Sequence, residues 1–431
     1  MPSSASLGLV VWLLLSAACR ADSTSPAVIE FWGMGREGEV VQQMVPEFER
    51  RTPGVQVRVQ QIPWSAAHEK LLTAFVGDAM PDVFQAGSTW IPEFVALDAL
   101  VPVQQRLASS AVTAAVDYFA GILDANVIDG VAYGVPWYVD TRVLFYRTDL
   151  LALAGVTQPP TTWEAWTDAM VRVKQRSGPG TYAILLPTNE WQTPVILAMQ
   201  LNAGLLRDHD QYGDFRSAAF RRAFGFYLDL FRRDLAPRAG DAQVANVFQD
   251  FANGFFTFYI TGPWNIGEFN RRLPPALAEH WATAPLPSAD ATYPGVSVAG
   301  GASLAISRRS AQPEAAWRWI EYLSEPAQQL ELYRLTGDLP ARQSVWTDTA
   351  LAHNRRTQAF AAQLERVRAT PKIPEWERIA ALLTDYADAA VRERMTPDEA
   401  LGALDTDVDA VLAKRRWMLQ RRAAGREEHD P

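Results

Sequence analysis

The feature that most constrains the fold is a regular alternation of strand and helix patterns near the start of the chain. VQVRVQQI, for example, alternates apolar and polar residues with the period of two that a half-buried strand requires. The predicted elements are, in order, a strand at 27–32, a helix at 37–50, a strand at 55–62, a helix at 66–78 and a strand at 82–87. Strand, helix, strand, helix, strand is the pattern of a doubly wound parallel sheet, so the predicted fold class is α/β.

A second α/β unit is predicted over residues 139–294. YAILLP and FFTFYI are its strand patterns, and Thr162 is the expected N-cap of a helix that begins at Trp163. The stretch PLPSADATYPGVSVAGG follows, and its Pro and Gly residues predict a segment that returns to the first unit. Further helices are predicted at 90–100, 109–123, 163–178, 215–234 and 313–337, and the tail from Trp346 is predicted to be almost wholly helical.

Length and charge exclude several classes of protein. With 431 residues the chain is long enough for two or more hydrophobic cores. Its formal net charge of −9 disfavours a nucleic-acid partner, since nucleic acids attract basic surfaces. The chain has one cysteine, Cys19, so no internal disulfide can form.

The first residues have the pattern of an export signal. The apolar run from Leu7 to Leu15 is too short to span a bilayer and is followed by small residues and Cys19. A cysteine in this position resembles the lipidation site of bacterial lipoproteins, although Ser16 stands where leucine is expected. We therefore expect a signal peptide at 1–18 and a lipid-anchored tether at 19–26, with an ordinary cleaved signal peptide as the alternative. Either reading places the protein outside the cytoplasm, in the periplasm or at the cell surface.

A glycine loop after the first predicted strand raises the question of a cofactor. Gly33, Gly35 and Gly38 form the pattern G-x-G-x-x-G that binds dinucleotides when a strand precedes it and a helix follows. The second strand, however, ends in Gln60-Gln61-Ile62 and lacks the acidic residue that would hold the ribose. We therefore expect no cofactor. The loop either offers backbone N–H groups to a ligand or only permits a tight turn.

No local motif nominates a catalytic or metal centre. The five histidines are widely separated, so the spacing of paired metal ligands does not occur. Neither a G-x-S-x-G motif nor a phosphate-binding lysine motif is present. A glycosidase remains an alternative, because its two carboxylates meet only in the folded chain.

The positions of the tryptophans are more informative about the kind of site than these motifs. Six of them lie in predicted loops, where aromatic rings can line a cleft: Trp64, Trp90, Trp137, Trp191, Trp264 and Trp376. Flat rings beside carboxylates and amides suit sugars, which present an apolar C–H face and a rim of hydroxyls. Two others lie inside a predicted helix, where Trp317 is expected in the core and Trp319 partly exposed.

Several stretches together resemble the extracellular solute-binding proteins of carbohydrate ABC importers, the family that includes maltose-binding protein. The stretches are, in the order of the family, FERRTPGVQVRVQQIPW, PDVFQAG, YGVPWYVDTRVLFYRTDLL, PPTTWEAW, ITGPW, PLPS with GVSVAGGASLAIS, PEAAWRWIEYL and TGDLPAR. The resemblance covers essentially the whole chain after the leader. It implies the two-lobe periplasmic-binding-protein fold, an α/β fold with a ligand cleft between lobes that crossing hinge segments connect.

The resemblance also implies where the lobes begin and end. The crossings are expected near Pro136–Val139, Pro294–Val298 and Leu339–Arg342. The first lobe would then comprise 27–138 and 295–340, and the second 139–294 and the helical part at 341–431.

What the resemblance implies for function is binding without catalysis: a monomer would capture a sugar and deliver it to the permease subunits of the importer. Asp140 matches an acidic residue just past the first crossing, and Trp264 a tryptophan that stacks on sugar. Arg342 is expected either to reach the cleft or to brace the hinge. The residues expected at the ligand are Gly33, Gly35, Glu37, Trp64, Ser88, Trp90, Tyr138, Asp140, Trp191, Trp264, Gly300, Gly301, Arg342 and Trp376. The alternative ligands for the same fold are a polyamine, a peptide or a glycerol phosphate ester.

Overall fold

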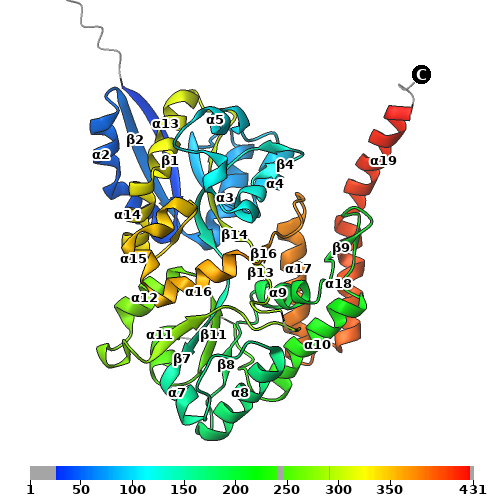
Figure 1. Ribbon diagram of the computed structural model, residues 1–431. Helices are drawn as coiled ribbons and strands as arrows, with labels where there is room; N and C mark the ends of the chain where they lie inside the picture. Colours follow the sequence, from blue (N-terminus) through cyan, green and yellow to red (C-terminus); the bar gives the residue numbers. More distant parts are fainter. Residues whose placement is uncertain (1–25, 241–245, 291, 428–431) are drawn as a thin grey trace, which may run out of the picture.

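Two lobes, each built on its own β-sheet, make up the part of the chain that the computed structural model describes, residues 26–240, 246–290 and 292–427 (Figure 1). The first sheet contains β1 (Ala27–Met34), β2 (Val55–Ile62), β3 (Val83–Gly87), β6 (Val135–Asp140), β14 (Gly300–Ile306) and β15 (Leu339–Pro340). Their order across the sheet is β15-β6-β14-β3-β1-β2. β1 is parallel to β2 and β3, as the alternation predicts, whereas β14 is antiparallel to both of its neighbours.

The second lobe contains a smaller sheet. Its strands are β7 (Val143–Arg147), β8 (Ile184–Leu185), β11 (Phe258–Thr261) and β12 (Trp281–Ala284), in the order β12-β7-β11-β8. The helices α8 (Trp163–Arg176), α9 (Gln192–Gln200) and α10 (Ala218–Arg232) supply apolar side chains to the core of this lobe. The predicted cap is confirmed, since the Thr162 side chain accepts a hydrogen bond from the backbone N–H of Ala165.

The chain passes between the lobes three times. β6 in the first sheet leads directly to β7 in the second, and the return passes through the short strand β13 (Ser297–Val298) into β14. β13 pairs with β16 (Val367–Arg368), which lies between the helices α16 (Arg355–Leu364) and α17 (Trp376–Val391). The predicted lobe boundaries stay predictions.

The remaining helices cover the two sheets and form the C-terminal tail. They are α1 (Gly35–Val40), α2 (Val45–Arg51), α3 (Trp64–Val76), α4 (Ile91–Ala96), α5 (Gln104–Ser109), α6 (Ala120–Asp124), α7 (Thr148–Leu153), α11 (Val247–Ala252), α12 (Trp264–Arg272), α13 (Pro313–Ser324), α14 (Pro326–Thr336), α15 (Thr349–Ala352), α18 (Pro397–Val411) and α19 (Ala413–Glu427). Within the described ranges, no helix is long and apolar enough to cross a membrane.

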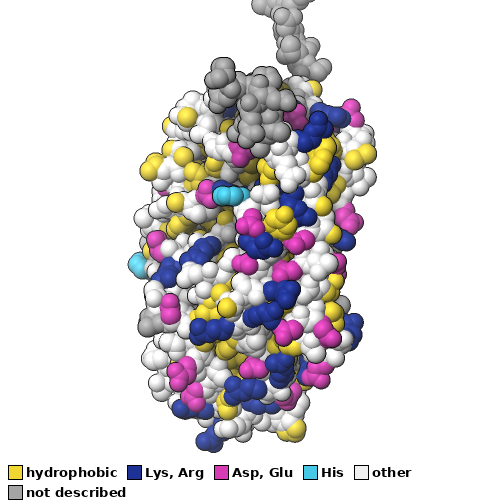
Figure 2. Space-filling model, turned by 90° about the vertical axis from the view of Figure 1, so that its right-hand side faces the viewer, with side chains coloured by type: hydrophobic (Ala, Val, Ile, Leu, Met, Phe, Trp, Pro, Cys, Tyr) yellow, Lys and Arg dark blue, Asp and Glu magenta, His cyan; other side chains and the backbone are white. Residues whose placement is uncertain are grey.

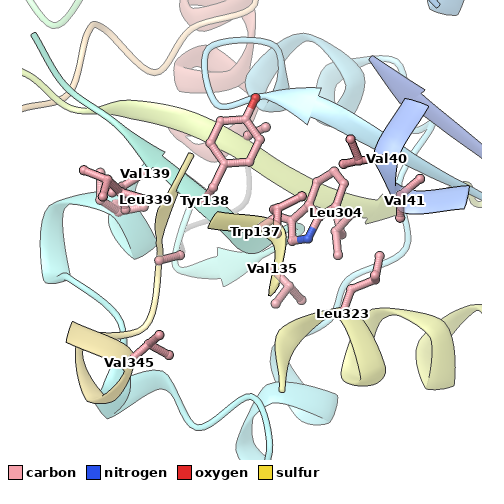
Figure 3. Close-up of a cluster of buried hydrophobic side chains, with 14 of the residues drawn as sticks. Val40, Val41, Val135, Trp137, Tyr138, Val139, Leu304, Leu323, Leu339 and Val345 are labelled. Carbon is pink, nitrogen blue, oxygen red and sulfur yellow. The ribbon is translucent and has the colours of Figure 1, made fainter. Parts of the chain in front are cut away.

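The prediction that Trp137 lies in a loop and lines the cleft is wrong, because this residue lies inside β6 and has no exposed surface. Figure 3 shows its ring among apolar side chains that include Val40, Val41 and Leu304. Its neighbour Tyr138 points to the opposite side of the strand, as the pleat requires (Figure 3). The strand therefore directs Trp137 into the core and leaves Tyr138 available to the cleft.

Three helix predictions also need correction. The segment predicted as a helix at 109–123 contains only a 3-10 turn at Ala115–Asp117 and the short helix α6. The helix predicted at 313–337 is divided at Glu325, because Pro326 cannot donate the hydrogen bond that would continue it. Trp319 of α13 is fully buried rather than partly exposed.

Candidate ligand-binding site

A cavity of about 470 Å³ lies between the two lobes. Its walls come from the loops that follow the carboxyl ends of β1, β3, β6 and β11, where α/β sheets usually place their ligands. The first lobe contributes Glu37, Ser88 and Tyr138, among others, and the second contributes residues from the starts of α9, α12 and α17.

Most of the predicted site residues line this cavity. They are Glu37, Trp64, Ser88, Trp90, Tyr138, Asp140, Trp191, Trp264, Gly300 and Gly301. The other four predicted residues, Gly33, Gly35, Arg342 and Trp376, are not part of its lining. The folded chain thus brings together residues that are up to 264 positions apart in the sequence, from Glu37 to Gly301.

Four tryptophans form aromatic walls on both sides of the cavity. Trp64 and Trp90 lie on the first lobe with ring centroids 5.6 Å apart in an edge-to-face arrangement. Trp191 and Trp264 lie on the second lobe. Such rings offer flat apolar surfaces to the cavity from both lobes.

The loop at 33–38 requires glycines because its backbone packs too closely for side chains. A Cβ on Gly38 would lie 2.4 Å from the carbonyl oxygen of Gly33, so neither position has room for a side chain. Gly35 has a φ of +50°, and a Cβ there would lie 2.6 Å from the Trp64 ring. The glycines are therefore required by a tight turn, which lets Trp64 approach Gly35 closely, and the prediction that the loop offers backbone N–H groups to a ligand stays a prediction.

Glu37 is held at the floor of the cavity by a chain of hydrogen bonds. The Tyr138 hydroxyl donates to Glu37 Oε1 at 2.6 Å and accepts from Gln85 Nε2 at 3.1 Å. Gln85 in turn accepts from the backbone N–H of Met34 at 2.7 Å, which fixes its orientation. Burial raises the pKa of the Glu37 carboxyl, although these hydrogen bonds act in the opposite direction.

A second buried carboxyl, Asp338, lines the same cavity just before β15. Burial, together with the nearby charge of Glu37, raises the pKa of Asp338 well above its ordinary value of 3.8. Two acids therefore share a site in which at least one proton is retained at pH values that would ionise both in water.

This pair predicts a pH dependence of stability. The folded chain keeps protons on Glu37 and Asp338 at pH values where the unfolded chain releases them, so raising the pH above about 4 favours the unfolded state. In Asp338→Asn the side chain can no longer bind a proton, so its contribution to this difference between the folded and unfolded chain disappears. We expect this variant to become more stable relative to the wild type as the pH rises from 5 to 8, with the free energies of unfolding measured by urea titration at each pH. A difference that is independent of pH would show that Asp338 is not held protonated.

Asp140, Arg142 and Trp264 form a layered group at one wall. Arg142 Nη1 lies 2.5 Å from Asp140 Oδ1, and the Arg142 guanidinium lies 4.7 Å from the centroid of the Trp264 ring. Burial lowers the pKa of Arg142, but the carboxylates of Asp140 and Glu190 outweigh burial and raise it overall. Arg142 therefore stays charged, pairs with Asp140 and stacks on Trp264. Asp140 thus both lines the cavity and makes an ion pair with Arg142.

Glu377 links the two lobes across the cavity. It lies on α17 of the second lobe and hydrogen-bonds with Thr89, which follows β3 of the first. Burial raises the pKa of its carboxyl. Its Oε1 is buried and has no hydrogen-bond partner among the described residues, so one acceptor at the cavity wall is unsatisfied.

Two predicted site residues have structural roles instead. Trp376 is fully buried in the core of the second lobe, and its ring packs edge-on against Trp191 at 5.4 Å. Arg342 braces the first lobe: its Nε lies 2.6 Å from Asp117 Oδ2, and its Nη1 donates to the carbonyl oxygens of Ser324, at 3.0 Å, and Val112. Neither side chain lines the cavity, and the polar groups of Arg342 are engaged by these partners in the first lobe.

Sequence reasoning missed several residues of the cavity. They are Arg36, Gly87, Thr89, Arg142, Gln192, Glu268, Val298, Ala299, Thr336, Asp338 and Glu377. Some carried a usable signal, since Thr89, Arg142 and Gln192 each lie within two residues of a predicted position. Glu377 and Asp338 carried a signal as well, since Glu377 directly follows Trp376 and Asp338 lies in the stretch TGDLPAR.

Comparison with known families decides the class of protein. The family model described as bacterial extracellular solute-binding protein matches residues 33–330, which is more than half of the chain. The chain belongs to this family. Its two-lobe fold and its interlobe cavity agree with the resemblance found in the sequence.

Individual relatives agree over most of their length. The structure of the sugar-binding protein MalE from the phytopathogen Xanthomonas citri is 48% identical, covers 91% of this chain and 99% of its own, and superposes with a TM-score of 0.86. The diacetylchitobiose binding protein DasA of Streptomyces coelicolor is 23% identical over 86% of each chain. An uncharacterized lipoprotein of Streptomyces antibioticus is 26% identical over 88% of this chain and 86% of its own.

Proposed function

We propose that this solute-binding protein captures a mono- or oligosaccharide in the interlobe cavity and delivers it to the permease subunits of an ABC importer. The observation that carries the proposal is the pairing of tryptophan rings from both lobes with carboxylates at the same cavity. Trp64 and Trp264 offer flat surfaces for the C–H faces of a sugar ring, and Asp140 and Glu377 offer acceptors for its hydroxyls. The sugar-binding MalE of Xanthomonas citri, with nearly half of its residues identical, supports the same ligand class.

The proposed role is capture and delivery, without chemical change to the sugar. Both lobes contribute walls to the cavity, so a bound sugar would stabilise the arrangement in which they face each other. A monomer suffices for this role, because one chain supplies the whole lining.

A thermal-shift screen over mono- and disaccharides tests the proposal directly. A sugar present at 100 times its Kd should stabilise the folded chain by about 2.7 kcal/mol and raise its Tm. The screen also includes a polyamine, a peptide and a glycerol phosphate ester, which represent the alternative ligand classes. Stabilisation by one of these and by none of the sugars would overturn the proposed ligand, and hydrolysis of the sugar during the incubation would overturn the non-catalytic role.

We further propose that the protein is exported and held at a membrane through a lipid on Cys19. This residue and the apolar run before it lie outside the described residues, so the support comes from the sequence and from the related Streptomyces antibioticus lipoprotein. Cys19→Ser should move the protein from the membrane fraction to the soluble fraction when the membranes are washed with 1 M salt, whereas the lipid-anchored wild type should stay with the membranes. Mass spectrometry of the wild type should find Cys19, with its lipid, as the first residue, and cleavage at any other position would contradict this.

A further inference from the structure

The C-terminal helix α19 concentrates positive charge in an otherwise acidic chain. Its 15 residues contain one acidic residue, Glu427, whereas the whole chain has a formal net charge of −9. The cationic residues of α19 are Lys414, Arg415, Arg416, Arg421, Arg422 and Arg426. The functional site uses none of them.

The beginning of α19 is fixed to the second lobe. The Arg416 guanidinium donates to the carbonyl oxygens of Gln211 at 2.7 Å and Asp409 at 2.8 Å, and it lies 4.5 Å from the centroid of the Tyr212 ring. These contacts set the direction in which the helix leaves the lobe. Arg416 is thus committed to the fold.

Beyond this base the helix presents apolar and cationic side chains to solvent together. Trp417 is 55% exposed and Met418 38% exposed, among the few large hydrophobic side chains that the described residues leave open. Arg421 lies one turn later, with its guanidinium 5.0 Å from the centroid of the Trp417 ring. An exposed tryptophan beside arginines is the combination found where a helix meets a membrane interface.

The direction of α19 places its free end on a particular side of the molecule. In Figure 1 the helix leaves the second lobe and runs beside the first, so that it ends at the same end of the molecule at which β1 begins. Figure 2 looks onto this side and shows Lys and Arg side chains down its middle, interspersed with acidic ones. The chain between Cys19 and Ala27 can span no more than about 30 Å. A membrane that held Cys19 would therefore lie on the side toward which α19 points.

We propose that α19 binds the anionic phospholipid surface of that membrane, as a second contact beside the lipid on Cys19; this rests on the proposed export and anchoring. Guanidinium groups pair with lipid phosphates, and clusters of four to eight Lys and Arg residues favour anionic leaflets. The contact would hold the second lobe as well as the tether near the permease.

The test uses the full chain with Cys19→Ser, so that the lipid does not dominate the result, and pure lipid vesicles, so that no permease contributes. Vesicles of mixed phosphatidylglycerol and phosphatidylcholine should sediment the protein, and vesicles of phosphatidylcholine alone should not. Binding should be lost at 1 M salt, where screening reduces the Debye length to about 3 Å. Failure to bind the mixed vesicles at low salt would overturn the proposal and would leave a protein partner for α19.

Matched variants assign the binding to α19. Changing Lys414, Arg421, Arg422 and Arg426 to Gln should lower the partition coefficient at least tenfold. The control variant removes four exposed positive charges from α8 and the end of α10, through Arg172, Arg176, Arg232 and Arg233 to Gln, and should bind like the parent. Equal losses in both variants would overturn the assignment to α19. Sugar titration of the same preparations reports on the cavity separately, so a failure of sugar binding and a failure of vesicle binding are distinguishable.

Discussion

Trp264→Ala is expected to weaken sugar binding at least tenfold, about 1.4 kcal/mol, while the Tm of the ligand-free protein changes little. The ring begins α12 at the cavity wall and is only partly buried, so its removal exposes little core. One side of the ring already meets the Arg142 guanidinium at 4.7 Å, which fixes its orientation before a ligand arrives. A fixed ring loses little freedom on binding, and this favours affinity.

Calorimetric titration beside a thermal melt decides the outcome. Trp417→Ala is the matched control, because its ring is 55% exposed on the outside of α19 and lies away from the cavity. It should leave sugar affinity unchanged. If Trp264→Ala kept full affinity and lowered the Tm strongly, the ring would be structural and the assignment of the cavity wall would be wrong.

Asp140→Asn tests the same cavity wall and is expected to lower both sugar affinity and Tm. The amide keeps the shape of the side chain but removes the charge that pairs with Arg142 at 2.5 Å. A charge-assisted hydrogen bond to a sugar hydroxyl contributes roughly 1.5–3 kcal/mol, so affinity should again fall at least tenfold. Because Arg142 is buried and would lose its partner, the Tm should fall as well, unlike in Trp264→Ala.

Trp319→Ala should lower the free energy of unfolding by about 3–5 kcal/mol, the cost of truncating a fully buried large aromatic side chain. The ring of Trp319 is fully buried on α13 and packs against Phe48 at 4.9 Å, Tyr322 at 5.6 Å and Phe31 at 5.8 Å between centroids. Those partners come from β1, α2 and α13, so the cavity that is left would lie where three elements meet.

Urea unfolding measures this loss, and a titration at a temperature where the variant is folded should find sugar affinity unchanged. The solvent-exposed counterpart, Trp417→Ala, should change stability by no more than about 0.5 kcal/mol. A loss below about 1 kcal/mol for Trp319→Ala would mean that the helix face is exposed, as the sequence had suggested.

Local patterns predicted the elements whose signals are themselves local. The period-two alternation of VQVRVQQI became β2, and the Thr162 cap precedes α8 as expected. It was harder to predict from the sequence which faces of a buried helix are covered. Trp317 and Trp319 are two positions apart, and both are buried, because β1 and α2 contact Trp319 while Arg106 of α5 lies over the Trp317 ring. A sequence pattern indicates one apolar stripe and does not show how many elements surround it.

The same limit explains which residues of the candidate site could be predicted from the sequence. Residues that follow strand ends, such as Trp90 and Asp140, could be predicted because the fold places every such loop at one edge of a sheet. Trp376 likewise begins a helix near the cleft, yet its ring turns into the core and packs against Trp191. Asp338 lies just before β15 of the first sheet and Glu377 lies in the first turn of α17, so their meeting at one cavity depends on how the two lobes are assembled. Rotamers and crossings depend on the assembled chain, so they were beyond the reach of local patterns.

The position of β14 has a consequence for how the protein can be made. This strand lies in the middle of the first sheet, between β6 and β3, although it begins only at Gly300. All four strands of the second sheet precede residue 285. During vectorial synthesis, therefore, the second sheet has all its strands while β3 and β6 still present unpaired edges, the surfaces most prone to wrong pairing. A first lobe produced on its own would need the segment 300–340 grafted onto the N-terminal part, and a chain that stops before Gly300 could not close it.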